Sequence, residues 1–374
     1  MKLTKIVSAL ALSGAVATSL FAADTVKIGV QAPITGKYAN EGQSIDNFVR
    51  LIVDEKNAQG GLLGKQIEVV TCDDEAKAQK AAVCAKKLTN AGVFAVIGSY
   101  TSGATEAAQT TYYRKKVLQT SDGTSDSLIE KKYWTFFRNS FPNSAQSDFT
   151  ADYFVNVKKY KNIVVLSDYS SYSAGLGDAT EASIKKAGGN VIFRGKIKSG
   201  TQNFTAVLTK IKAMNPDVIY YSGYYTDGGL LRAQQIQLGI EADFVGGDSN
   251  DNPDFYKLAG KASAGTVLIN FPTPEILPYK EAKKYLGDYK ARFKMDPPSI
   301  WPVTNADGLR AVIEGVEKTN SFDTKKISDY IRNDMKDFPG ITGPFNIRED
   351  GERVGAKFVV YKLKNDGTKE VVGQ

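Results

Sequence analysis

Histidine is absent from the 374 residues of this sequence. It is the commonest general base, and Ser-His-Asp triads, Cys-His pairs and nearly all catalytic zinc sites depend on it. Its absence argues strongly against hydrolase chemistry. The sequence therefore predicts no catalytic residue, no cofactor and no metal site.

Cysteine is almost absent too, since Cys72 and Cys84 are the only two. In an oxidising compartment, a pair at this short spacing forms a disulfide more often than a metal site. The disulfide would tie the end of a strand to the following helix. By loop-entropy arithmetic it would stabilise the fold by roughly 3 kcal/mol.

Long apolar runs are missing except at the N-terminus. There Lys2 and Lys5 precede an uncharged stretch, 6–23, with a short apolar run and small residues. This pattern is typical of a secretory signal peptide, and its hydroxyl residues make it a poor membrane-spanning helix. We expect 1–23 to be the signal peptide, with a mature start near Asp24. No cysteine lies near that start to carry a lipid, so we expect a soluble protein in the periplasm.

Acidic residues are outnumbered, so the formal net charge is +7, or +5 without Lys2 and Lys5. A basic balance can indicate nucleic acid binding. The lysines here occur as scattered pairs, which are typical of a solvated surface, so we expect no nucleic acid partner. The pairs are Lys131-Lys132, Lys158-Lys159, Lys185-Lys186 and Lys283-Lys284.

Short β-branched runs alternate with amphipathic stretches along the chain. Strands are expected at 26–30, 66–70, 93–98, 162–166, 191–193 and 217–221, and helices at 42–58, 76–90, 103–114, 174–186, 204–214 and 228–238. This alternation predicts parallel sheets with right-handed crossovers. A third block, 279–333, is mainly helical and is followed by two strand-like pieces, 341–347 and 356–364.

The fold class expected is α/β, with two doubly wound, Rossmann-like lobes that meet near residue 142. About 350 residues remain after the signal peptide, more than one hydrophobic core usually serves. Ligands bind beyond the carboxyl ends of parallel strands. Five such ends carry hydroxyls, carboxylates and aromatics, which would converge on one cleft: 98–103, 120–126, 168–172, 222–225 and 246–250.

The chain resembles the leucine/isoleucine/valine-binding protein family, the type I periplasmic solute receptors of ABC transporters. The order and spacing of several pieces carry the resemblance: 26–30 leading to Thr35-Gly36, 57–61 with Gly64, Asp73-Asp74, 96–98, Tyr172 with Gly175, 220–224 and Gly343-Pro344. It implies two lobes joined by a three-segment hinge. It also implies an amino acid ligand, hinge closure, delivery to an inner-membrane ABC permease, and a monomer.

The hinge in turn implies discontinuous lobes. The N-lobe would comprise 24–142 plus about 270–350, and the C-lobe 143–269 plus about 351–374.

Three residues match the positions that hold the amino acid group in this family. Ser102 falls where the ligand carboxylate binds, and its place before a helix agrees with that role, although it could also be a plain helix N-cap. Thr124 matches a residue that contacts both carboxylate and ammonium. Asp248 matches the acid that pairs with the ammonium, and a simple turn residue is its alternative.

Aromatic residues match the rest of the family's pocket. The resemblance implies that Tyr172 and Tyr224 cover the ligand on closure, although a Tyr at a strand end can equally belong to the core or the rim. Tyr100 and Thr101 should line the pocket for the ligand's side chain.

Two residues depart from the family pattern. Glu41 stands where an aromatic is common, although Tyr38 nearby could substitute, and Asp122 stands where a small residue is usual. Carboxylates are costly to bury unpaired beside an apolar side chain. Either both point to solvent, or the ligand carries additional polar or cationic groups.

Alternatives in other classes remain open at this point. The same transport role is compatible with an amide, a urea-like solute or a small carboxylate as ligand. An exported enzyme could use Asp73-Asp74, or Asp122 with Asp126, but nothing defines the separation that paired catalytic carboxylates need. A sensory or regulatory domain of the same fold is another alternative, but no DNA-binding or membrane segment is visible after the signal peptide. A surface adhesin is the third.

Overall fold

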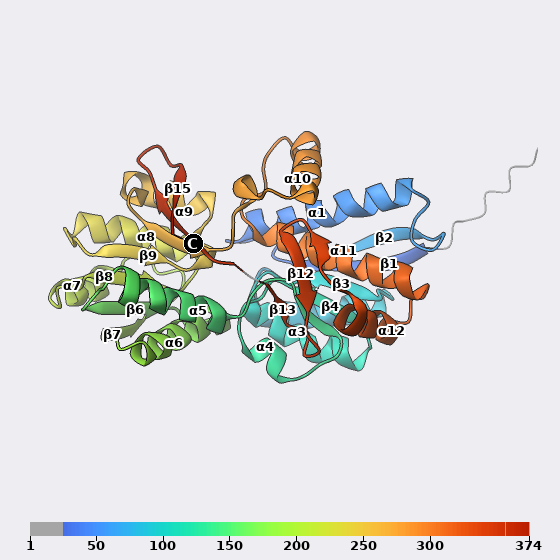
Figure 1. Cartoon of the computed structure of the whole chain (residues 1–374), viewed down its shortest axis with the longest axis horizontal. Coiled ribbons are helices and arrows are strands. Elements are labelled where there is room, and N and C mark those ends of the chain that lie inside the picture. Colours follow the sequence, from blue (N-terminus) through green and yellow to red (C-terminus); the bar gives the residue numbers. More distant parts are fainter. Residues whose placement is uncertain (1–24, 356, 374) are drawn as a thin grey trace, which may run out of the picture.

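The computed structural model describes residues 25–355 and 357–373, and the expected signal peptide, 1–23, lies outside them. Two α/β halves stand side by side (Figure 1). We call the half on the right of that view, built on the sheet of β1 to β5, the N-lobe. The half on the left, built on the larger sheet, is the C-lobe.

The N-lobe sheet has five parallel strands in the order β2-β1-β3-β4-β5. The strands are β1 (Thr25–Ala32), β2 (Gln66–Asp73), β3 (Ala95–Gly98), β4 (Leu118–Ser121) and β5 (Phe136–Arg138). The helices around it include α1 (Ala39–Ala58), α2 (Ala78–Asn90), α3 (Ser102–Arg114), α4 (Ser127–Glu130) and α11 (Trp301–Thr319). Residues of α1 and α11 share one core cluster, and those of α2 and α3 share another, so helices cover both faces.

The C-lobe sheet has seven strands in the order β15-β14-β10-β9-β8-β6-β7. They are β6 (Ile163–Ser167), β7 (Val191–Lys196), β8 (Val218–Tyr221), β9 (Asp243–Gly246), β10 (Val267–Asn270), β14 (Val359–Leu363) and β15 (Lys369–Gly373). Its helices are α5 (Asn143–Asp152), α6 (Ser171–Lys186), α7 (Thr205–Lys212), α8 (Tyr225–Gln237) and α9 (Pro253–Ala259). Strands β6 to β10 repeat the N-lobe order, and β14 and β15 join antiparallel.

Apolar residues fill both faces of each sheet because successive side chains of a strand point to opposite sides. In β6, Val164 and Leu166 face the main core cluster. Ile163 and Val165 face the cluster beneath α5 and α6. A strand buried on both faces, such as β6, is therefore mostly apolar, which is why these short runs are visible in the sequence.

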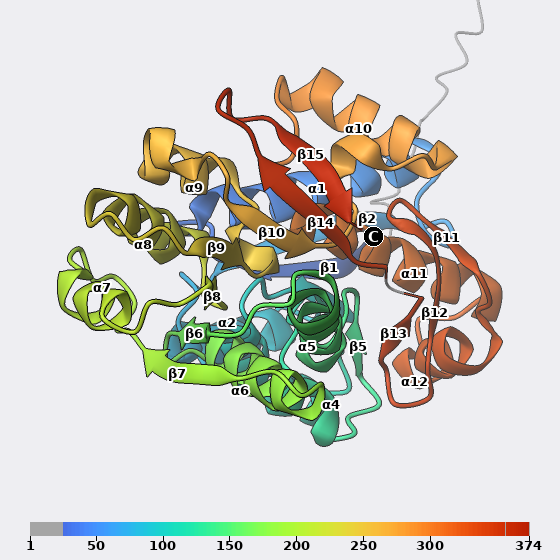
Figure 2. The same cartoon turned by 60° about the vertical axis from the view of Figure 1, so that its left-hand side comes forward.

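The chain passes between the two large sheets three times: after β5, after β10 and after β13. The segment between the last two passages holds α10 (Lys280–Phe293), α11, α12 (Thr324–Asp329), β11 (Phe338–Gly340), β12 (Gly343–Ile347) and β13 (Arg353–Val354). It packs on the N-lobe: the Tyr289 ring of α10 stacks on Phe48 of α1, with ring centroids 4.4 Å apart. Figure 2 shows β14 and β15 returning to the C-lobe from there.

The predicted fold class is confirmed, whereas several predicted helix starts are wrong. Helix α6 begins at Ser171 and not at 174, because the Ser170 side chain accepts a hydrogen bond from the Ser173 N–H and so caps the helix. Helix α8 begins at Tyr225 and not at 228. Residues expected in loops after strands therefore lie in the first turns of helices.

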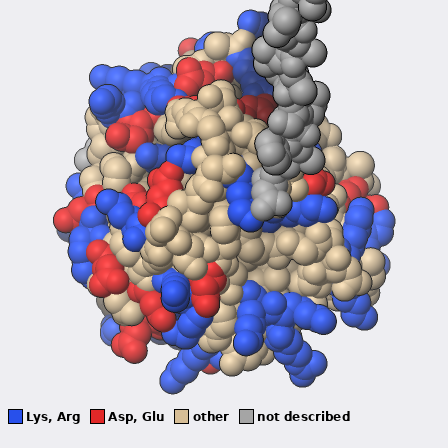
Figure 3. Space-filling view, turned by 90° about the vertical axis from the view of Figure 1, so that its right-hand side faces the viewer, with Lys and Arg blue, Asp and Glu red and all other residues tan. Residues whose placement is uncertain are grey.

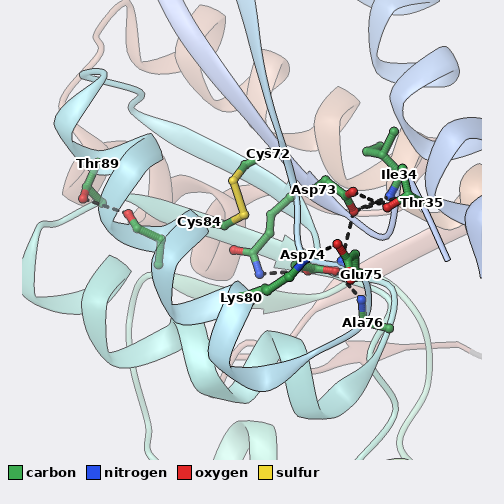
Figure 4. The surroundings of a disulfide bond; sticks show 12 residues. Ile34, Thr35, Cys72, Asp73, Asp74, Glu75, Ala76, Lys80, Cys84 and Thr89 are labelled. Atoms are coloured by element: carbon green, nitrogen blue, oxygen red, sulfur yellow. Dashed lines mark hydrogen bonds and ion pairs between the residues drawn. A yellow bond between two sulfur atoms is a disulfide. The ribbon is translucent and has the colours of Figure 1, made fainter.

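The expected disulfide joins Cys72 at the end of β2 to Cys84 in α2 (Figure 4). Next to it, Asp73 anchors the turn after β1. Its carboxylate accepts hydrogen bonds from the backbone N–H of Ile34 (3.0 Å) and the hydroxyl of Thr35 (2.6 Å). The disulfide thus lies at the edge of the segment that leads into α1.

Replacing both cysteines by alanine is expected to destabilise the N-lobe by about 3 kcal/mol, the loop-entropy value for so short a loop. Urea denaturation followed by circular dichroism measures this, with the oxidised protein as the reference. Adding reductant should shift the wild-type transition toward that of the double variant and leave the variant's own transition in place. An unchanged wild-type transition under reductant would contradict a stabilising role.

The molecular surface mixes charges of both signs. Figure 3 shows Lys and Arg interspersed with Asp and Glu over much of one face, with several basic side chains together near its lower edge. Many are paired; Lys284 Nζ lies 2.8 Å from Glu55 and 3.1 Å from Asp288. Across residues 25–355 and 357–373, no helix is long and apolar enough to cross a bilayer.

Candidate ligand-binding site

A small cavity of about 10 Å³ lies between the lobes. It is lined by Tyr100, Ser102, Asp122, Thr124 and Trp301 from the N-lobe, and by Tyr172, Tyr224, Asp248 and Ser249 from the C-lobe. The structure thus brings together seven of the ten residues predicted for the site. This is roughly the space that one water molecule needs, so the lobes must separate before a solute can occupy the site.

The cavity lies where the carboxyl ends of parallel strands face each other across the two lobes. In the N-lobe, Ser102 follows β3 and Asp122 follows β4. In the C-lobe, Tyr172 follows β6 and Asp248 follows β9. Ligand sites form at such ends in open α/β sheets, as the sequence predicted.

A glycine shapes the turn that leads from β3 into the cavity. Gly98 has φ +114°, a backbone conformation that side chains disfavour, and a Cβ there would lie 1.9 Å from the Gln31 carbonyl oxygen. The chain therefore approaches β1 closely at this point, which sets the path of the next four residues.

The N-terminus of α3 points its first turn at the cavity. The N-cap is Thr101, and Ser102 is the first helical residue, so the alternative of Ser102 as the N-cap is wrong. The Ser102 hydroxyl accepts a hydrogen bond from Ser125 N (3.2 Å), which leaves its hydrogen to donate. Free N–H groups and the positive end of the helix dipole favour an anion here.

Thr124 adds a hydroxyl beside this helix end. Its Oγ1 is buried and has no hydrogen-bond partner among the described residues. Burying a hydroxyl without a hydrogen-bond partner is unfavourable, and a bound ligand that hydrogen-bonds to it would remove this cost. Thr124 therefore fits a group that contacts the ligand directly.

Asp248 supplies a buried carboxylate from the opposite lobe, and its side chain is fully buried. One oxygen accepts a hydrogen bond from the Tyr172 hydroxyl, and the other, Oδ2, has no partner in the described chain. Burial raises the pKa of this carboxyl to about 7, although the Tyr172 bond opposes the rise. A ligand cation beside Oδ2 would stabilise the ionised form.

Tyrosine rings from both lobes meet around the cavity. The Tyr224 ring centroid lies 4.9 Å from that of Tyr172 and 6.0 Å from that of Tyr100. Tyr38 is outside the cavity lining and packs behind it, with its ring centroid 4.7 Å from Tyr224. Such rings exclude water and hold their positions through edge and tilted contacts.

Asp122 is the second carboxylate that faces the cavity, and only 2% of it is exposed. The alternative that it points to solvent is therefore wrong. Neither of its oxygens has a hydrogen-bond partner within the part of the chain that the structure describes. Burial, with the nearby Glu41 and Asp248 carboxylates, raises its pKa well above the usual range, and the Asn305 amide opposes this.

Glu41 is fully buried as well, so the solvent alternative fails for it too. It is absent from the cavity lining and joins the lobes instead. Its carboxylate accepts hydrogen bonds from Asn252 Nδ2 of the C-lobe (2.6 Å) and from Ser299 Oγ of the N-lobe (2.8 Å). Burial raises its pKa to about 7 against these two bonds.

Further hydrogen bonds cross between the lobes along the same edge. Lys37 Nζ donates to Ser199 Oγ (2.6 Å), and Asn40 Nδ2 donates to Asp254 Oδ2 (2.9 Å). The Tyr225 hydroxyl donates to Asn40 Oδ1 (2.7 Å). The lobes are thus in contact, and the cavity between them is closed.

One further predicted residue lies outside the cavity lining, and two residues that were not predicted belong to it. Thr101 is buried with its Oγ1 unpartnered among the described residues, but it is not part of the lining. Sequence reasoning missed Ser249 and Trp301, which do line the cavity. Ser249 adjoins Asp248 in a segment already marked as a strand end, whereas Trp301 opens a helix and has no local signal.

Two doubly wound lobes with a small polar cavity between them define a solute-binding receptor. The chain belongs to the periplasmic binding protein family, whose sequence model matches residues 25–368. This family groups solute receptors rather than enzymes. The resemblance inferred from the sequence is thereby confirmed.

Relatives and solved structures cover nearly the whole chain. The leucine-, isoleucine-, valine-, threonine- and alanine-binding protein of Pseudomonas aeruginosa is 29% identical over 374 residues, covering 99% of this chain and 98% of the relative. The leucine-binding protein LivK of Thermotoga maritima matches with TM-score 0.86 and 28% identity, over 92% of this chain and 97% of that one. LivJ of Streptococcus pneumoniae, solved with isoleucine, matches with TM-score 0.84 and 29% identity, over 94% of this chain and 100% of that one.

Proposed function

We propose that the chain is the receptor of an ABC import system and traps an α-amino acid between its lobes. One observation carries the proposal: the cavity between the lobes has the N-terminal end of α3, which favours an anion, on one side and, on the other, a carboxylate oxygen of Asp248 that has no partner among the described residues. An α-amino acid has a carboxylate and an ammonium at a fixed short separation. The relatives named for amino acids support this reading.

Each residue would have a defined role. Ser102, Thr124 and the first N–H groups of α3 bind the ligand carboxylate, and Asp248 binds the ammonium. Both contacts are charge-assisted, which makes them stronger than neutral hydrogen bonds. Tyr172 and Tyr224 cover the ligand, and Tyr100 lies toward its side chain, with Thr101 behind.

The three passages between the sheets would form the hinge. Rotation about them opens the cavity, and the ligand favours closure because it contacts both lobes. The contacts of Glu41, Asn40 and Lys37 across the lobes would hold the closed form. The closed receptor would then dock on an inner-membrane permease.

The proposed function also requires that the chain is exported. Residues 1–23 would direct the chain to the periplasm as a signal peptide, and the mature protein would act as a monomer. The pattern of Lys2 and Lys5 before an apolar run supports the first point.

A thermal-shift panel of the mature protein tests the ligand class. Binding to the folded state raises the melting temperature, and ligand at 100 times Kd adds about 2.7 kcal/mol of stability. We expect at least one α-amino acid to raise it, while amides, urea and simple carboxylates do not. A shift with a simple carboxylate and with no amino acid would overturn the proposal.

A further inference from the structure

The Asp122 carboxylate has no function in the amino acid clamp described above. It lines the same cavity, is 2% exposed, and neither oxygen has a hydrogen-bond partner in residues 25–355 or 357–373. A buried carboxylate with no partner is among the costliest groups to leave in a closed site. Its presence there points to a partner supplied by the ligand.

Neither charged end of the amino acid group pairs with the Asp122 carboxylate. The ligand's α-ammonium is matched by Asp248, and its α-carboxylate by the end of α3. Among the described residues, no Lys or Arg lines the cavity. Glu41 adds a further buried carboxylate close by, whose bonding partners Asn252 and Ser299 are neutral. No basic side chain of the described lining is therefore available to pair with Asp122.

Two further polar groups of the lining lack partners. The Tyr100 hydroxyl and the Trp301 Nε1–H are buried and make no hydrogen bond within the described residues. The pocket for the ligand's side chain thus presents a carboxylate, a phenol and an indole N–H. An aliphatic side chain would bury all three groups without satisfying any of them.

We propose that this receptor binds an α-amino acid whose side chain carries an N–H donor, with a cationic ammonium or guanidinium favoured, held by the Asp122 carboxylate. This inference rests on the proposed function. It narrows the ligand to a class that differs from the leucine and isoleucine in the names of the similar structures. Asp122 acts as the residue that determines side-chain specificity.

Calorimetric titration of the mature, ligand-free protein tests this directly. The panel is leucine, isoleucine, glutamine, ornithine, lysine and arginine. We expect one or more of the last four to bind at least about 10-fold more tightly than leucine or isoleucine, the scale of one hydrogen bond to a charged group. Leucine or isoleucine binding as tightly as the best of the four would overturn the inference.

Two variants at this position sharpen the test. Asp122→Ala should weaken binding of the N–H-bearing ligand by about 10-fold or more relative to leucine. Asp122→Asn keeps the side-chain volume and one acceptor oxygen, so it replaces the alanine variant if that variant does not fold. It should weaken the binding of a cationic ligand and retain the binding of a ligand with an amide side chain. Unchanged affinity of the preferred ligand in a folded variant would contradict the role of Asp122.

The outcomes distinguish a failure of this inference from a failure of the proposed function on which it rests. If the wild type binds no α-amino acid, neither these six nor any in the thermal-shift panel, the proposed function itself fails. If it binds leucine best and loses that binding in Asp248→Asn, the function stands and the inference about Asp122 fails.

Discussion

Asp248→Asn is expected to weaken amino acid binding by about 2 kcal/mol or more, which is roughly a 30-fold rise in Kd. The fully buried carboxylate has one oxygen satisfied by Tyr172 and one free for the ligand's ammonium. An amide keeps the volume but removes the charge, so the ammonium would be buried without its counter-ion. Isothermal titration calorimetry measures the change.

Asp178→Asn provides the matched control. It makes the same chemical change at a carboxylate that is 60% exposed, pairs with Arg194 and does not line the cavity. Its affinity should equal that of the wild type. Equal affinities in Asp248→Asn and Asp178→Asn would show that Asp248 does not hold the ligand.

Arg138→Met is expected to lower the stability of the fold by roughly 3–5 kcal/mol, the cost of breaking a buried ion pair. Arg138 is fully buried in β5, and its Nε lies 2.7 Å from Glu352 Oε1. Its guanidinium also donates to the carbonyl oxygens of Gly123 and Ser125, which flank Thr124. Removing it leaves a buried carboxylate and two carbonyls without their partner.

Urea denaturation measures this loss of stability, and two further variants serve as comparisons. Arg348→Met breaks a surface pair with Asp350 in which the arginine is 55% exposed, so it should cost under about 1 kcal/mol. Adding Glu352→Gln to Arg138→Met should recover part of the loss, because no unpaired charge then remains. A cost for Arg138→Met no larger than that for Arg348→Met would contradict the account.

The sequence was sufficient to predict the fold class and most residues that line the cavity between the lobes. Strands such as β6 and β8 are buried on both faces, so they appear as short, mainly apolar runs between helical stretches. The ends of β3, β4 and β9 carry the polar residues that a ligand needs, and the topology brings them together. Local pattern and a general rule of parallel sheets were enough for both.

Contacts between distant segments were not predictable. Glu41 bonds to Asn252 and Ser299, which lie 211 and 258 positions further along the chain. Nothing local distinguishes this carboxylate from an exposed one in the first turn of a helix, where acids are common. Trp301 likewise enters the cavity through the packing of α11 on the N-lobe, which no periodicity reveals.

One measurement tests the central claim most directly. The mature protein is titrated calorimetrically with the amino acid that raises its melting temperature most, and with two analogues of it, one lacking the α-ammonium and one lacking the α-carboxylate. The account predicts that each analogue binds at least about 10-fold more weakly than the parent, because each leaves one end of the clamp unpaired. Either analogue binding as tightly as the parent would contradict a clamp formed by Ser102, Thr124 and Asp248.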